Sequence, residues 1–287
     1  MRKISTLIAI SLVSGLSYGG YRFFTASYHA PQLSTSTATT AKTIPATPTI
    51  ATHTIDSDTL SQEINALLDQ YSTMDVSVSI ADISTGKTFQ YGDDAGYVAA
   101  SVTKLITACL YLHEVESGNA SMTTVIDGTS ANDLLQALIV NSDNTAWTSL
   151  NNYLGATALS NYASSIGMAS YDESTNLITS QDIALLLTKL YKQQLLNSSN
   201  TNLLLSYMQQ ANYASYIPAA VSSSITVYHK AGVLDDRFHD AAILYDGTHA
   251  YVLVIFSKTS GAYNATAGQA LFHAISAASS QTILGKS

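Results

Sequence analysis

Cysteine is nearly absent from this chain, and its scarcity excludes two kinds of framework. Cys109 is the single cysteine among 287 residues and lies in an apolar stretch, so neither a disulfide nor a thiolate metal site can form within the chain, and we expect a core residue. The seven histidines include no His-x-x-x-His pair at ligand spacing. We therefore expect no metal and no other cofactor.

Charged residues are also sparse. They make up 11% of the chain, the formal net charge is -8, and no run of Lys or Arg could follow a phosphate backbone. These features exclude nucleic acid as a partner.

The amino-terminal region has the pattern of an export signal. Arg2 and Lys3 precede an apolar run at about 4–16, and the weak cleavage signal favours a retained anchor over residues 1–26, with secretion after cleavage as the alternative. Residues 27–56 are rich in Ser, Thr, Ala and Pro and predict a mobile stalk. Residues 57–287 remain for one folded domain, which we expect to be monomeric, extracytoplasmic and tethered to the membrane.

The hydrophobic pattern of that domain predicts a sheet interrupted by helices. A helix at 57–71 precedes strands at 76–83 and 89–91, and strands at 225–229, 241–245 and 251–257 precede a last helix at 265–278. Between them we expect helices at 101–116, 130–140, 145–154, 179–196 and 200–210. This order predicts an α+β fold in which N- and C-terminal strands form one antiparallel sheet, flanked by helices, with an all-helical lobe inserted.

Three short motifs carry the chemistry: Ser101-Val102-Thr103-Lys104, Ser142-Asp143-Asn144 and Lys230-Ala231-Gly232. Ser-x-x-Lys at a helix start places a nucleophile and a base on one face, and the serine N–H faces a developing oxyanion. Each motif also has an ordinary explanation: solvated helix residues, a loop with helix caps, and an edge lysine before a bulge glycine.

The order and settings of the motifs resemble those of class A β-lactamases and penicillin-binding proteins, over about residues 58–285. The resemblance implies a β-lactamase-like transpeptidase fold and an acyl-enzyme at Ser101. It implies a β-lactam or a peptidoglycan-like peptide as substrate. It assigns catalytic roles to Lys104, Ser142 and Lys230, and substrate contacts to Asn144, Gly232 and Val233, whose N–H would be the second oxyanion donor.

Ala231 departs from the family pattern, which has a hydroxyl residue that binds the substrate carboxylate. Arg237 and His239 alternate on the next strand, and each is either a substitute carboxylate ligand or an ordinary exposed residue. We expect Asp240 to pair with one of them.

The acid that activates the deacylating water in class A enzymes also lacks a clear counterpart. Glu173 is the one tolerable candidate, in a segment too short for a full omega loop. We therefore expect slow deacylation. Two alternatives remain open: a true class A-type β-lactamase that uses Glu173, and a catalytically inactive wall-binding module.

Overall fold

The computed structural model describes residues 55–285. The predicted anchor and nearly all of the predicted stalk lie outside the described residues. Within 55–285, no helix combines the length and the apolar character needed to cross a bilayer.

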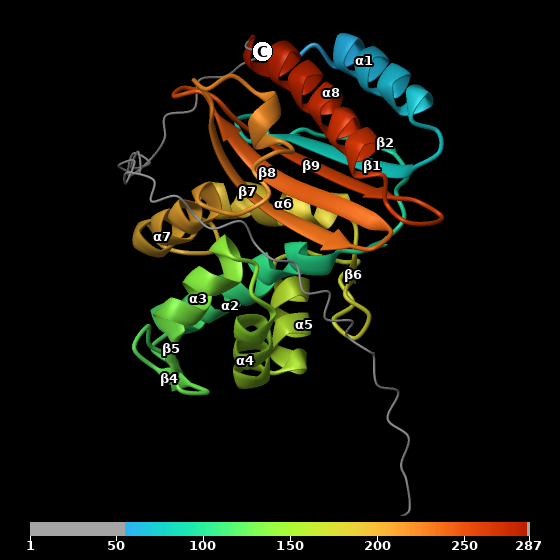
Figure 1. The fold of residues 1–287 in the computed structure, drawn as a ribbon. Coiled ribbons are helices and arrows are strands. Elements are labelled where there is room, and N and C mark those ends of the chain that lie inside the picture. Colours follow the sequence, from blue (N-terminus) through green and yellow to red (C-terminus); the bar gives the residue numbers. More distant parts are fainter. Residues whose placement is uncertain (1–54, 286–287) are drawn as a thin grey trace, which may run out of the picture. The chain divides into compact units, whose positions relative to one another are not determined.

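A five-stranded antiparallel sheet organises the described part of the chain (Figure 1). Its strands are β1 (Asp75–Asp82), β2 (Thr88–Gly92), β7 (Thr226–Leu234), β8 (Arg237–Tyr245) and β9 (Ala250–Lys258), in the order β2-β1-β9-β8-β7. The pairing of β1 with β9 joins the two ends of the domain, as predicted. Strand β7 forms one edge of the sheet.

Helices cover both faces of the sheet (Figure 1). On one face α1 (Ser57–Gln70) and α8 (Ala265–Leu284) enclose an apolar cluster that includes Leu253 and Ile255 of β9. On the other face α6 (Ser180–Tyr191) and the helical lobe pack on Val254 and Phe256. Because successive side chains of a strand point to opposite faces, the central strand supplies both cores.

The helical lobe holds α2 (Lys104–Glu116), α3 (Ala131–Val140), α4 (Asn144–Leu154), α5 (Ala156–Ser165) and α7 (Ser198–Gln209). Short turns η1 (Ala100–Thr103) and η2 (Pro218–Ala220) and the two-residue strands β3 (Tyr97–Val98), β4 (Val125–Ile126), β5 (Thr129–Ser130) and β6 (Leu177–Ile178) complete the described elements. Every residue from Lys104 to Leu112 is buried, so α2 is the central helix of the lobe. Cys109 is a buried, free thiol, and burial raises its pKa to about 12.

Several boundaries differ from the predicted ones. Helix α5 was not predicted, and α6 ends at Tyr191 instead of residue 196. Strand β7 continues to Leu234, β8 begins at Arg237 instead of residue 241, and α8 continues to Leu284 instead of residue 278. Two helices of the domain begin at side-chain caps: Ser130 before α3 and Thr179 before α6 each accept a hydrogen bond from the main-chain N–H three residues later.

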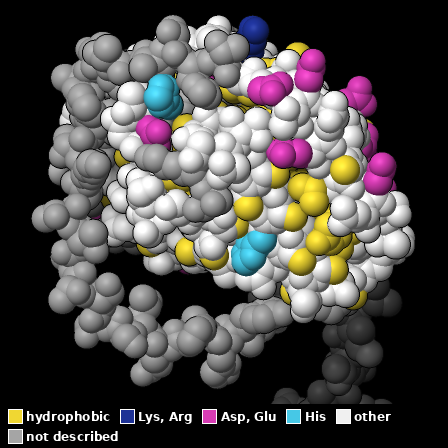
Figure 2. Space-filling view, turned by 90° about the horizontal axis from the view of Figure 1, so that it is seen from above, with side chains coloured by type: hydrophobic (Ala, Val, Ile, Leu, Met, Phe, Trp, Pro, Cys, Tyr) yellow, Lys and Arg dark blue, Asp and Glu magenta, His cyan; other side chains and the backbone are white. Residues whose placement is uncertain are grey.

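Acidic side chains lie on the face of the molecule that α1 and α8 form. Figure 2 shows Asp and Glu side chains along one side of this face, apolar patches beside them and few basic side chains. On this one face, the distribution agrees with the net charge of -8.

Candidate active site

Ser101 lies in a tight turn immediately before α2. It is the second residue of η1, and it follows Ala100, whose φ of 51° is unusual for a residue other than glycine. The Ser101 side chain is half-buried, and its hydroxyl has no hydrogen-bond partner among residues 55–285. The hydroxyl is therefore available to an incoming group.

Lys104, one turn later, is fully buried in the resolved fold. Its Nζ donates to the main-chain oxygen of Ser142 at 2.5 Å and to Asn144 Oδ1 at 2.7 Å, and it lies 5.4 Å from the centre of the Trp147 ring. Burial lowers the pKa of Lys104 to about 7, and the Asp143 carboxylate partly opposes that shift. A neutral amine can donate both of its hydrogens to these oxygens and keep its lone pair for a proton.

Lys230 reaches the same serine from the edge strand β7. It is fully buried, and its Nζ donates to Ser142 Oγ at 2.8 Å and to Ala231 O at 2.9 Å. Burial first, and then the charge of Lys104, lower the pKa of Lys230 to about 7, while Asp240 opposes the shift. Both lysines thus meet at Ser142.

The Ser142-Asp143-Asn144 motif occupies the break between α3 and α4. Ser142 has a φ of 57°, and Asp143 caps α4 by accepting from the N–H of Ala146 at 2.7 Å. The left-handed residue turns the chain so that both oxygens of Ser142 face the lysines. The cap at Asp143 is therefore shown, and the role of Ser142 and Asn144 in catalysis stays a prediction.

Gly232 brings the edge of β7 against the turn that carries Ser101. A Cβ at this position would lie 2.6 Å from Ala99 O and 3.0 Å from Ser101 N, so only glycine permits this approach. Val233 follows on the strand and is 40% exposed. The Ser101 and Val233 main chains therefore lie on adjoining segments, and the second oxyanion donor stays a prediction.

Comparison with known proteins agrees with this geometry. Residues 59–283 match the sequence model of the Beta-lactamase enzyme family. This chain belongs to that family.

Solved structures share the fold. A mutant of PBP-A in an acyl-enzyme complex with penicillin G has a TM-score of 0.73 at 20% identity, over 78% of this chain and 96% of that one. An ancestral class A β-lactamase has a TM-score of 0.72 at 21% identity, over 78% of this chain and 100% of that one. A β-lactamase from Chitinophaga pinensis has a TM-score of 0.71 at 18% identity, over 76% and 97%. No curated protein sequence matches.

This member of the beta-lactamase enzyme family departs from the expected carboxylate site. Ala231 is buried in the apolar cluster beneath α8, on the sheet face opposite Lys230. Arg237 is partly exposed, and Nε and one terminal nitrogen each bind Asp236 at 2.6 Å. The charge of Arg237 is thus already paired with Asp236, the residue directly before β8.

His239 is fully buried instead of exposed. Nε2 lies 3.1 Å from Val98 O, and Nδ1 accepts from the N–H of Ser257 at 3.2 Å. This pattern requires the neutral ring, and burial lowers the pKa of His239 to about 4. With both nitrogens engaged, the ring supports Val98 and has no nitrogen left for a substrate carboxylate.

The predicted pairing of Asp240 with Arg237 or His239 is wrong. Asp240 Oδ1 lies 2.9 Å from His229 Nδ1, and both side chains are buried. The reason is the alternation of strand residues, which places Asp240 on the opposite face of β8 from Arg237 and His239.

The 172–177 loop contains the predicted deacylation acid. Asp172 binds Ser174 and Thr175 within the loop. Glu173 is half-buried. The pKa of Tyr171 is raised, chiefly by the burial of Tyr171 and then by the charge of Glu173. No contact within the described part of the chain joins Glu173 to Ser101, so its role stays a prediction.

Sequence reasoning missed two residues that contact the candidate site. Asn176 contacts the turn that carries Ser101, and nothing in its spacing indicates this. Trp147, the single tryptophan, stands three residues after Asn144, and this helical spacing could have placed it beside Lys104.

No group of three or more His, Cys, Asp or Glu side chains within 55–285 is arranged to hold a metal ion.

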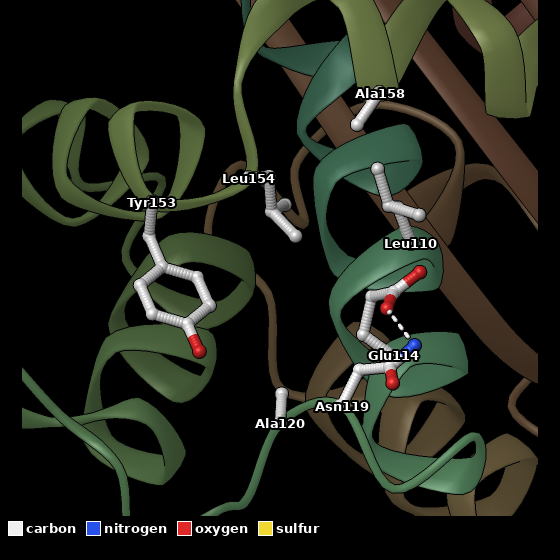
Figure 3. A pocket seen from close by; sticks show the side chains of 7 residues that line it. All are labelled: Leu110, Glu114, Asn119, Ala120, Tyr153, Leu154 and Ala158. Atoms are coloured by element: carbon white, nitrogen blue, oxygen red, sulfur yellow. Dashed lines mark hydrogen bonds between the residues drawn. The ribbon is translucent and has the colours of Figure 1, made fainter.

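A separate cavity of about 280 Å³ lies in the helical lobe (Figure 3). Its lining residues are Leu110, Glu114, Asn119, Ala120, Tyr153, Leu154 and Ala158. None of them is a predicted site residue.

Proposed function

We propose that this protein is an extracytoplasmic serine acyl hydrolase or transferase that forms an acyl-enzyme at Ser101. Its substrates are β-lactams or cell-wall peptides, and its deacylation is slow. The observation that carries the proposal is the convergence of two buried lysines, Lys104 and Lys230, on Ser142, from a helix that starts directly after the Ser101 turn and from the strand that lies against that turn.

Acylation begins with neutral Lys104. Its Nζ accepts the hydroxyl proton of Ser101 while Oγ forms a bond to the substrate carbonyl carbon. The negative oxygen that develops is stabilised by the N–H groups of Ser101 and Val233. Gly232 supports this step because it allows the two segments to meet.

Collapse of the intermediate breaks the bond from carbon to nitrogen. The departing nitrogen takes the proton of Ser142 Oγ, and the Lys104 ammonium, whose Nζ lies 3.5 Å from that oxygen, restores it. The net result is transfer of one proton from Ser101 to the leaving group. Protonated Lys230 holds Ser142 in place and supplies positive potential for a substrate carboxylate.

Deacylation needs a base that activates water. Asp172 is occupied inside its own loop, and the loop side chain that reaches the nucleophile turn is the amide of Asn176. An amide has no proton-accepting site comparable to a carboxylate. These contacts support a persistent acyl-enzyme.

The location of the enzyme is part of the same proposal. Arg2, Lys3 and the following apolar run support a retained anchor that leaves the catalytic domain outside the cytoplasm, as a monomer. A cell-wall substrate would be accessible there. Partition of the full-length chain with membranes, lost on deletion of residues 1–26, is the expected result.

Covalent labelling tests the proposal. A fluorescent penicillin should label the wild-type protein and fail to label Ser101→Ala. Ser117→Ala, at an exposed serine at the other end of α2, is the matched control and should label like wild type. A folded wild-type protein that stays unlabelled on long exposure would contradict the proposal and favour the inactive wall-binding alternative.

Measurement of substrate turnover tests the other alternative, a true class A-type β-lactamase. Rapid hydrolysis of a chromogenic cephalosporin that is lost in Glu173→Gln would identify a β-lactamase that uses Glu173.

A further inference from the structure

The turn that carries Ser101 is held in an unfavourable backbone conformation. Ala100, directly before the nucleophile, has a φ of 51°, and a left-handed alanine costs on the order of 1–2 kcal/mol. Such a conformation persists only where neighbouring groups hold it in place. The described contacts therefore identify which residue does so.

Asn176 makes three hydrogen bonds to this turn. Its main-chain oxygen accepts from the N–H of Ala99 at 2.9 Å, its Nδ2 donates to Ala100 O at 2.9 Å, and its Oδ1 accepts from Thr103 Oγ1 at 2.6 Å. The contacts bracket Ser101 on both sides.

The pairing of β3 with β6 explains how Asn176 arrives there. Val98 pairs with Leu177, and the bond between Ala99 and Asn176 continues that ladder by one residue. Asn176 itself has a φ of 55°, so the strand ends and the side chain turns to the nucleophile. Ala100 and Asn176, which both have a positive φ, are thus joined by a hydrogen bond.

We propose that Asn176 is a positioning residue that fixes the hydroxyl and N–H of Ser101 for acylation. This inference rests on the proposed function of the same site. An amide suits the position because it donates to a carbonyl and accepts from a hydroxyl at once. A carboxylate would face the Ala100 carbonyl with no hydrogen to donate.

Kinetics of acylation give the first test. Asn176→Gly keeps the left-handed backbone and removes both side-chain bonds. The acylation rate constant at saturating penicillin should fall roughly 10- to 100-fold, since a small misplacement of a reacting group has effects of that size. The dissociation constant of the non-covalent complex should stay unchanged, which a general loss of structure would not produce.

Matched variants isolate the side-chain contacts. Gln193→Gly changes another left-handed residue, with a φ of 56°, away from the site, and it should acylate like wild type. Thr103→Val removes the hydroxyl that Asn176 accepts from, so its effect should be less than additive with Asn176→Gly. Asn176→Asp, which keeps the size of the side chain, should not restore acylation.

Hydrogen exchange provides a readout that does not depend on activity. The peptide 98–104 should exchange faster in Asn176→Gly than in wild type, while the α8 peptides should not change. Unchanged exchange and unchanged acylation in that variant would overturn the positioning role and leave the proposed function standing. Absence of acylation in wild type itself would instead overturn the proposed function.

Discussion

Gly232, which has no side chain, lets β7 lie close to the turn that carries Ser101. Gly232 lies against the main chain of Ala99 and Ser101, and its Cα has no room for a methyl group. Gly232→Ala should push the strand and the turn apart. We expect acylation to fall at least about tenfold, because reacting groups tolerate little displacement, and the free energy of unfolding to fall by about 1–3 kcal/mol, as for other overpacked sites.

The comparison variant is Gly261→Ala, since a Cβ at exposed Gly261 meets no atom within 4 Å. It should match wild type in labelling rate and in urea denaturation. Equal acylation rates for Gly232→Ala and Gly261→Ala would show that the close approach is not needed.

The pH dependence of acylation follows from Lys104. Its pKa is lowered to about 7, chiefly by burial, and the base must be neutral to accept a proton. The acylation rate should therefore fall about tenfold per pH unit well below 7. Because the mechanism also requires protonated Lys230, whose pKa is likewise about 7, the rate should fall again well above 7. A rate independent of pH between 5 and 8, measured by stopped-flow labelling, would exclude Lys104 as the base.

The sequence was sufficient for the residues that form motifs and insufficient for those that support them. The spacing of Ser101 and Lys104 is tied to chemistry, and the family resemblance added Ser142 and Lys230. The structure brings both lysines to Ser142. The burial of His239 could not be predicted, because it depends on how β8 packs against Val98 and Ser257. Such contacts have no local signature.

At the scale of elements, helix α4 links stability to the site through its cap. Asp143 accepts from the N–H of Ala146 and raises the pKa of Lys104 by its charge. Asp143→Ala should cost about 1 kcal/mol of unfolding free energy. It should also lower the pKa of Lys104 further, so the midpoint of the acylation profile should move to lower pH.

A second cap provides the control. Asn197 caps α7 in the same manner, away from both lysines. Asn197→Ala should lose a similar free energy of unfolding without moving the acylation midpoint. A shift of equal size in both variants would mean that the loss of a helix cap, and not the loss of the Asp143 charge, moves the midpoint of the acylation profile.

The elements that were mispredicted depend on tertiary contacts. The apolar pattern of α6 continues through Leu195 and Leu196, which are buried, yet left-handed Gln193 turns the chain after the helix. β7 continues across Lys230 and Gly232 because β8 pairs with it throughout. Neither effect is visible in a window of sequence, whereas caps and alternating strands are.

For the whole molecule, His239 joins the sheet to the β3 segment that precedes the Ser101 turn, through its hydrogen bond to Val98 O. Burial lowers the pKa of His239 to about 4, so the unfolded chain binds more protons than the folded one between pH 4 and 6.5. Stability from this group is complete above about pH 6.5 and is lost as pH falls toward 4. From pH 7 to pH 5 the loss should be about 2 kcal/mol.

Urea denaturation at the two pH values measures this loss. His239→Gln should remove the contribution of this residue, so its stability should change by about 2 kcal/mol less between pH 7 and pH 5. His113→Ala, at an exposed position of α2, should retain the full loss. Identical pH dependence of wild type and His239→Gln would contradict the assignment.

The most direct measurement of the central claim is a pulse-chase with penicillin followed by intact-mass spectrometry and peptide mapping. We predict a single adduct on the peptide that contains Ser101, which persists after free penicillin is removed. A folded protein without an adduct, or an adduct on another residue, would contradict the account.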